Sequence, residues 1–387
     1  MKKFTIIVLT AILFLGYSIS AKAEIETVPI KFIYINGANN NTPKMQKWFF
    51  KGINKLHPTM KKTLQSSDFV SKNMLKNNTY EIGDVPGVFF WGDKSIGDLE
   101  NVDERLITLN MISPKMAQVF RTFFAHCMHD AIWVQKDHNM QPIVKDLHKE
   151  IMTAYNRGEK VVLLGYSAGS FITYEYLFYK IPAISNKTLT QMVDFNENQN
   201  QFVQQNPINN TCIDALISSK LIIFSTEGTL IPTSDFQQFR EIYEKLNDYT
   251  KQVCTPEGTL LGIINYASPI VLFYSDNRDP SIEINKYNKY IYKYLVSNDM
   301  FTITVNFSDD PLGYPLTKNV TPDELKNMYD FEFADSGKGF MYDKSNVKSP
   351  STFLGAHTSY WKHSKKFSKA VRDAYIEGYK NFYEKNQ

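Results

Sequence analysis

The sequence is poor in cysteine, with three in 387 residues. At most one disulfide can therefore form within the chain, and an oxidising compartment would favour it. We expect this bond between Cys212 and Cys254, because both flank polar, loop-like segments. Cys127 lies instead in an apolar helical pattern.

Long hydrophobic runs are absent except at the N-terminus. Two lysines precede an apolar run over residues 4–16, and Ala-Lys-Ala follows at residues 21–23. A charged segment, a short apolar run and a small-x-small site are typical of a secretory signal peptide rather than of a membrane span. We expect cleavage near Ala23 and a protein that is secreted or periplasmic. After Ala23 no stretch of the sequence is long and apolar enough to cross a bilayer.

A charge imbalance is absent too, once the signal peptide is removed. The chain has 43 Lys and Arg against 40 Asp and Glu, and three of the lysines lie in residues 1–23, which hold no acid. The remaining 40 basic and 40 acidic residues cancel. This balance predicts no nucleic-acid partner. The sequence has no dinucleotide-binding or P-loop fingerprint, and we expect no cofactor.

Short apolar runs alternate with longer helical patterns over the roughly 360 remaining residues, a length that fits one large α/β domain or two small ones. The patterns predict strands at residues 30–35, 88–91, 161–164, 221–224 and 301–307, and helices at 143–155, 170–179 and 360–383. Such alternation is typical of an α/β fold with a mainly parallel sheet. Two intervals, 93–139 and 227–299, are too long for simple crossovers. We interpret them as insertions over the strand ends within a single domain, residues 24–387.

The pentapeptide Gly-Tyr-Ser-Ala-Gly at residues 165–169 follows a buried strand pattern and opens a helical one. Gly-x-Ser-x-Gly alone occurs by chance in a chain of this length with a probability of roughly one in ten. The strand-to-helix context makes it informative, because a sharp turn there exposes a serine hydroxyl above the carboxyl end of the strand. We predict that Ser167 is a nucleophile, with the N–H of Ala168 facing a developing oxyanion.

A serine nucleophile needs a general base and an acid that orients it. Only His357 and His363 follow Ser167 among the seven histidines, and His363 falls inside the predicted terminal helix. We therefore predict His357, in a loop after a predicted strand at residues 340–342, as the base. Asp310 directly follows the strand at 301–307 and is our preferred acid. Asp309 beside it, and Asp276 after another strand-like run, remain alternatives.

The segment YINGANNNT follows the first strand and supplies Gly37 and Ala38 as further candidate donors to the oxyanion. Asn36 or Asn39 could brace this loop by hydrogen bonds, although asparagines are also common in turns.

His126 and His129 lie three residues apart on a predicted helix, but no third ligand is identifiable, so we predict no metal site. The apolar residues between 111 and 133 fit core packing better than an acyl-chain groove.

The order strand-NGA, GYSAG, DDPLGYPL and GAHTSYW resembles the α/β-hydrolase superfamily, in particular its secreted lipase- and esterase-like branch. The resemblance implies an α/β-hydrolase fold, with helices on both faces of the sheet, and a Ser167–His357–Asp310 triad that cleaves carboxylic esters through an acyl-enzyme. The apolar inserts favour lipid-like or other apolar acyl esters, and a transient contact with a lipid surface. An acyltransferase with the same triad, or a hydrolase-fold binding protein without activity, are the alternatives.

Overall fold

The computed structural model of the chain describes residues 27–39, 42–111, 114–180, 189–190, 193–206, 220–226, 230–253, 255–256, 258–273, 295, 299–315, 339–352 and 354–383. The predicted signal peptide (residues 1–23), the predicted Cys212–Cys254 bond and the alternative acid Asp276 lie outside these ranges. Within them, no helix combines the length and the hydropathy that a membrane span requires.

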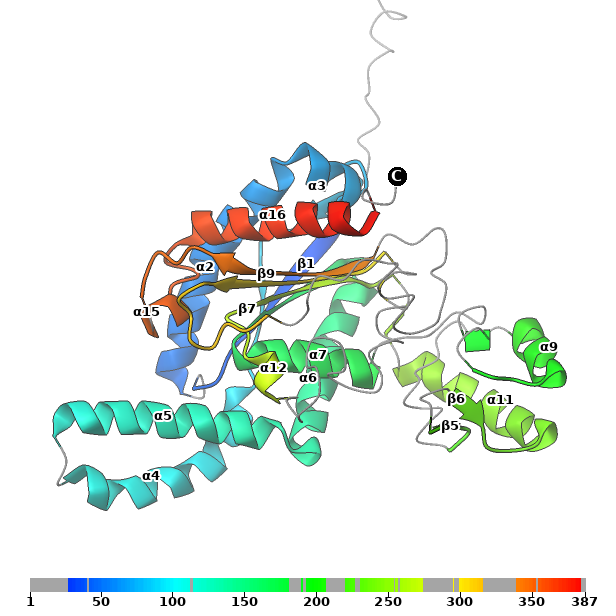
Figure 1. The fold of residues 1–387 in the computed structure, drawn as a ribbon, viewed down its shortest axis with the longest axis horizontal. Helices are drawn as coiled ribbons and strands as arrows, with labels where there is room; N and C mark the ends of the chain where they lie inside the picture. Colours follow the sequence, from blue (N-terminus) through cyan, green and yellow to red (C-terminus); the bar gives the residue numbers. More distant parts are fainter. Residues whose placement is uncertain are drawn as a thin grey trace, which may run out of the picture.

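A seven-stranded parallel sheet organises the described residues (Figure 1). In chain order its strands are β1 (Val28–Ile35), β2 (Tyr80–Ile82), β3 (Gly87–Phe89), β4 (Lys160–Tyr166), β7 (Leu260–Tyr266), β8 (Phe301–Phe307) and β9 (Phe340–Val347). The spatial order is β2-β1-β4-β7-β8-β9, and β3 pairs with β1 beyond the end of β2. All these pairs are parallel, which confirms the predicted α/β class with a mainly parallel sheet.

The three middle strands are buried along nearly their whole length, as expected for a parallel sheet covered on both faces. The strand predicted at 301–307 has the bounds of β8. The structure corrects the interval 227–299, because residues 260–266 inside it form β7, which pairs with β4 and β8. This interval is therefore not one continuous insertion. Gly262 and Asn265 interrupt the apolar run and weaken its strand pattern.

Helices cover both faces of the sheet (Figure 1). One face carries α2 (Pro43–Gln65), α3 (Asp68–Asn73) and α16 (Ser364–Tyr383), and the other carries α6 (Asp137–Asn156) and α7 (Ala168–Lys180). Helix α2 buries Phe49, Ile53, Leu56 and Met60, whose helical spacing places them on one side. Helix α16 starts at Ser364, four residues later than the predicted start at 360, because the intervening residues form turns.

Two groups of elements extend beyond the sheet layers (Figure 1). The first follows β3 and forms a helical hairpin: η1 (Gly92–Ser95), α4 (Ile96–Met111) and α5 (Lys115–Val134). The second has its own small core and contains α9 (Glu197–Gln205), β5 (Ile222–Phe224), β6 (Leu230–Pro232) and α11 (Phe236–Val253). The strand predicted at 221–224 is thus β5, which pairs antiparallel with β6 rather than joining the parallel sheet. Short helices α12 (Ile270–Phe273) and α15 (Leu354–His357) complete the described elements.

Candidate active site

Ser167 occupies the single position between the end of β4 and the start of α7. Its φ of 52° is left-handed, a conformation that is unfavourable for a residue with a side chain and common in strained functional turns. The two flanking glycines permit this turn. A Cβ on Gly165 would lie 2.6 Å from Asn265 Oδ1, and one on Gly169 would lie 2.6 Å from Asn36 O. The sequence reading of the pentapeptide as a sharp strand-to-helix turn is therefore confirmed.

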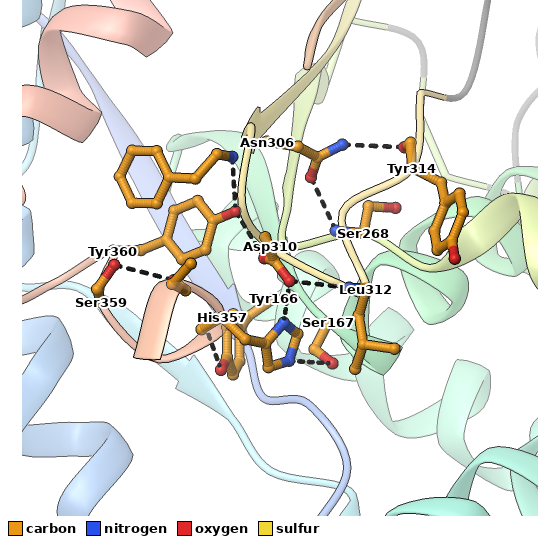
Figure 2. A network of polar contacts seen from close by, with 12 residues as sticks. Tyr166, Ser167, Ser268, Asn306, Asp310, Leu312, Tyr314, His357, Ser359 and Tyr360 are labelled. Carbon is orange, nitrogen blue, oxygen red and sulfur yellow. Dashed lines mark hydrogen bonds and ion pairs between the residues drawn. The ribbon is translucent and has the colours of Figure 1, made fainter. Parts of the chain in front are cut away.

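The structure brings Ser167, His357 and Asp310 together in one chain of hydrogen bonds (Figure 2). His357 Nε2 lies 3.1 Å from Ser167 Oγ, and His357 Nδ1 lies 2.9 Å from Asp310 Oδ1. A carboxylate can only accept, so Nδ1 carries a proton and Nε2 is left to accept from the serine hydroxyl. The three residues are 6%, 8% and 6% exposed, which keeps the chain of hydrogen bonds largely away from water.

Parallel topology explains how residues so far apart in sequence meet. Ser167 follows β4, Asp310 follows β8, and His357 lies in α15 after β9. The carboxyl ends of parallel strands share one edge of the sheet, which is where ligands bind in open α/β sheets. Asp309, one residue before Asp310, points elsewhere: its carboxylate accepts from Ser308 Oγ and is exposed. Among the described residues, Asp310 is the acid that contacts His357.

Two buried tyrosines hold the histidine and the acid in place (Figure 2). Tyr360 donates its hydroxyl to Asp310 Oδ2 at 2.8 Å and accepts the N–H of Phe307 at 3.0 Å. Tyr166 donates to the backbone carbonyl of His357 at 3.0 Å. Burial, and then the charge of Asp310, raise the pKa of both tyrosines well above 10.0. Both hydroxyls therefore stay protonated and remain donors. The sequence reading assigned no role to either tyrosine.

The turn that carries Asp310 is fastened at two points. Asp310 Oδ1 accepts the N–H of Leu312 at 3.0 Å, an Asx turn around Pro311. Asn306, which is fully buried in β8, donates to Tyr314 O and accepts the N–H of Ser268, both at 2.9 Å (Figure 2). These contacts tie the end of the turn to the end of β7. The carboxylate is thereby held in a defined orientation before any substrate binds.

The loop at residues 36–39, called here the β1 loop, lies directly against the serine turn. A Cβ on Gly37 would come within 2.7 Å of Ser167 Cβ, so the loop backbone contacts the candidate nucleophile. Asn36 is fully buried, donates through Nδ2 to Gly37 O at 2.9 Å and accepts the N–H of Trp91 at 3.0 Å. In a trans peptide the C=O and the following N–H point in opposite directions, so Asn36 sets the direction of the Ala38 N–H.

Ala168 is the first residue of α7, where backbone N–H groups have no acceptor within the helix. It is buried beside Ser167, so its backbone lies next to the candidate nucleophile, as does that of Gly37 in the β1 loop. Nowhere in the described ranges do three His, Cys, Asp or Glu side chains gather as metal ligands. The two histidines considered as metal ligands contact carboxylates. His126 lies 2.6 Å from Asp103, and His129 lies 3.3 Å from Asp130.

No protein-family model, curated protein or solved structure matches this chain.

Proposed function

We propose that this chain is a serine hydrolase that cleaves carboxylic esters, built on an α/β-hydrolase fold. The observation that carries the proposal is the hydrogen-bonded chain from Ser167 through His357 to Asp310, with the serine on a left-handed strand-to-helix turn. The order of the strands supports the fold: nucleophile, acid and histidine follow β4, β8 and β9 at one edge of the sheet.

The reaction follows from these positions. His357 Nε2 accepts the Ser167 proton as Oγ attacks the ester carbonyl, and the backbone N–H groups of Ala168 and of Gly37 or Ala38 stabilise the oxyanion. The imidazolium, stabilised by Asp310, then protonates the leaving alcohol as the C–O bond breaks. Water, deprotonated by His357, attacks the acyl-enzyme, and the imidazolium returns this proton to Ser167 Oγ as the bond to the acyl group breaks and the acid leaves.

We propose apolar acyl esters as the substrate class and export as the cellular destination. The hairpin of α4 and α5 exposes Met111, Met128 and Ile132, which supports apolar ligands and a transient contact with a lipid surface. Export rests on the N-terminal segment at residues 1–23.

A fluorophosphonate probe tests the nucleophile, because it phosphonylates activated serines. We expect labelling of the wild-type protein and none of Ser167→Ala. Labelling that persists in the variant would exclude Ser167, and no labelling of either protein would favour a binding protein without activity. Hydrolysis of p-nitrophenyl esters of graded chain length then defines the acyl preference.

The acid is tested by a matched pair of neighbouring substitutions. Asp310→Asn should lower kcat by about 10³-fold or more, because the amide no longer holds the required histidine tautomer. Asp309→Asn should change kcat less than twofold, because Asp309 contacts Ser308 and not the histidine. A larger loss in Asp276→Asn than in Asp310→Asn would overturn the assignment.

A further inference from the structure

We infer that Asp130, on α5, is a positioning residue that sets the backbone of the β1 loop and so the direction of its oxyanion donors. The inference rests on the proposed ester hydrolysis and adds to it a residue outside the triad. It assigns a role in catalysis to the helical hairpin, which supplies Asp130.

Asp130 is a charged side chain with no exposed surface. Its Oδ2 accepts the backbone N–H of Asn39 at 2.7 Å, and its Oδ1 accepts from Ser95 Oγ at 2.8 Å. His129 Nδ1 lies 3.3 Å from the same Oδ1. Burial of a carboxylate is costly unless donors surround it, and hydrogen bonds to a charged acceptor are the stronger ones. The carboxylate thus joins three elements: η1, α5 and the β1 loop.

The backbone of Asn39 is left-handed, with a φ of 59°, a conformation that asparagine adopts more readily than most residues with a side chain. The contact with Asp130 Oδ2 holds the Asn39 N–H in place within this turn. Helix α5 contacts Asn39 twice, since His126 Nδ1 lies 3.4 Å from Asn39 Oδ1. His126 and Asp130 are four residues apart and face the same side of α5. On its other side, His126 Nε2 contacts Asp103 of α4 at 2.6 Å.

The β1 loop is therefore held at both ends. Asn36 fixes the Gly37 carbonyl at the start, and Asp130 fixes the Asn39 N–H at the end. Ala38 lies between these two points, next to the backbone that contacts Ser167. Donors stabilise an oxyanion most when their N–H groups already point to its position before the reaction begins. Loss of the Asp130 contact frees the Ala38–Asn39 peptide, so that the preceding Gly37–Ala38 peptide, which carries the Ala38 N–H, is held by Asn36 alone of these two contacts. The triad keeps all its own hydrogen bonds.

The test compares Asp130→Ala and Asp130→Asn with Ser95→Ala, which removes another donor to the same carboxylate but leaves the loop contact. We would measure kcat per site titrated with fluorophosphonate, KM for p-nitrophenyl butyrate and Ki for an aryl trifluoromethyl ketone. The ketone forms a hemiketal with the serine, whose oxyanion needs the same donors as the transition state. A role in stability alone would not change this Ki.

We expect kcat to fall tenfold to a hundredfold in Asp130→Ala, with KM within twofold and Ki raised by a similar factor. In Asp130→Asn we expect kcat to fall and Ki to rise threefold to tenfold, because the neutral amide oxygen still accepts the Asn39 N–H but more weakly. Ser95→Ala should keep kcat, KM and Ki within twofold of the wild-type values. If Asp130→Ala does not fold, Asp130→Asn decides on the same criteria.

Values of kcat and Ki within twofold of wild type in the folded Asp130 variant would overturn the inference. So would a fall in kcat without a matching rise in Ki. These failures differ from failure of the proposed function, which would appear as a wild-type protein that neither hydrolyses esters nor reacts with fluorophosphonate.

Discussion

Tyr360 offers a sharp test of how the candidate acid is held. Its hydroxyl is fully buried, donates to Asp310 Oδ2 and accepts the N–H of Phe307. Tyr360→Phe removes one oxygen atom and leaves the ring, which stacks on Phe307 at 4.2 Å between centroids. The substitution therefore removes two hydrogen bonds and little packing.

The magnitude follows from those two bonds. A hydrogen bond to a charged group contributes about 1.5–3 kcal/mol, and an unpaired buried N–H costs about 1–3 kcal/mol. We expect the free energy of unfolding to fall by about 2.5–6 kcal/mol. Asp310 Oδ1 keeps its contacts with His357 and Leu312, so only part of this loss should reach the transition state. About 1 kcal/mol corresponds to a fivefold to tenfold fall in kcat/KM.

The matched control is Tyr266→Phe. The Tyr266 ring lies 5.4 Å from that of Tyr360, and its buried hydroxyl has no hydrogen-bond partner within the described structure. Removal of this hydroxyl should leave kcat/KM within twofold and leave stability unchanged or raise it by about 1 kcal/mol. Urea unfolding and ester hydrolysis would be measured on both variants. Equal losses of stability and of kcat/KM in the two variants would refute the reasoning. So would a kcat/KM of Tyr360→Phe within twofold of the wild-type value.

Two further predictions concern groups outside the site. Burial lowers the pKa of the His57 imidazole from 6.5. Below about pH 6.5 this imidazole therefore binds a proton more readily in the unfolded chain than in the native protein. The stability linked to this group is therefore complete above that pH and is lost as pH falls. Calorimetry from pH 7 to 5 should show a shallower decline of Tm in His57→Gln than in wild type, and equal slopes would contradict this. Burial and then the charge of Asp130 raise the pKa of Cys127 from 9.0 to about 12, which lowers its thiolate fraction at pH 8 about a thousandfold. Mass spectrometry after iodoacetamide treatment should find Cys127 modified in the unfolded but not in the native protein, and rapid native modification would be evidence against it.

Local patterns in the sequence determined much of the architecture and part of the site. A continuous apolar run predicted the strand at 161–164, as is typical of a strand covered on both faces, and a period-two alternation predicted the strand at 301–307. The serine turn was readable because strand, glycine, serine and helix signals are adjacent in the chain. His357 could be singled out because only two histidines follow Ser167.

Where a contact joins distant residues, the sequence left the outcome open. Asp310, Asp309 and Asp276 each ended a strand-like run, and the structure places Asp310 against a histidine 47 positions away. Strand β7 went unrecognised because its glycine and asparagine break the apolar pattern, whereas its place in the sheet depends on packing between β4 and β8.

By itself, then, the sequence determined the α/β class, the serine turn and the candidate base, because periodicity and turn chemistry act between near neighbours. Only the tertiary structure decided which acid meets His357, which tyrosines hold the pair, and that Asp130 reaches Asn39 from 91 residues away. The physical reason is that a buried polar group is satisfied by whichever donors the packed fold brings to it, and no local pattern specifies them.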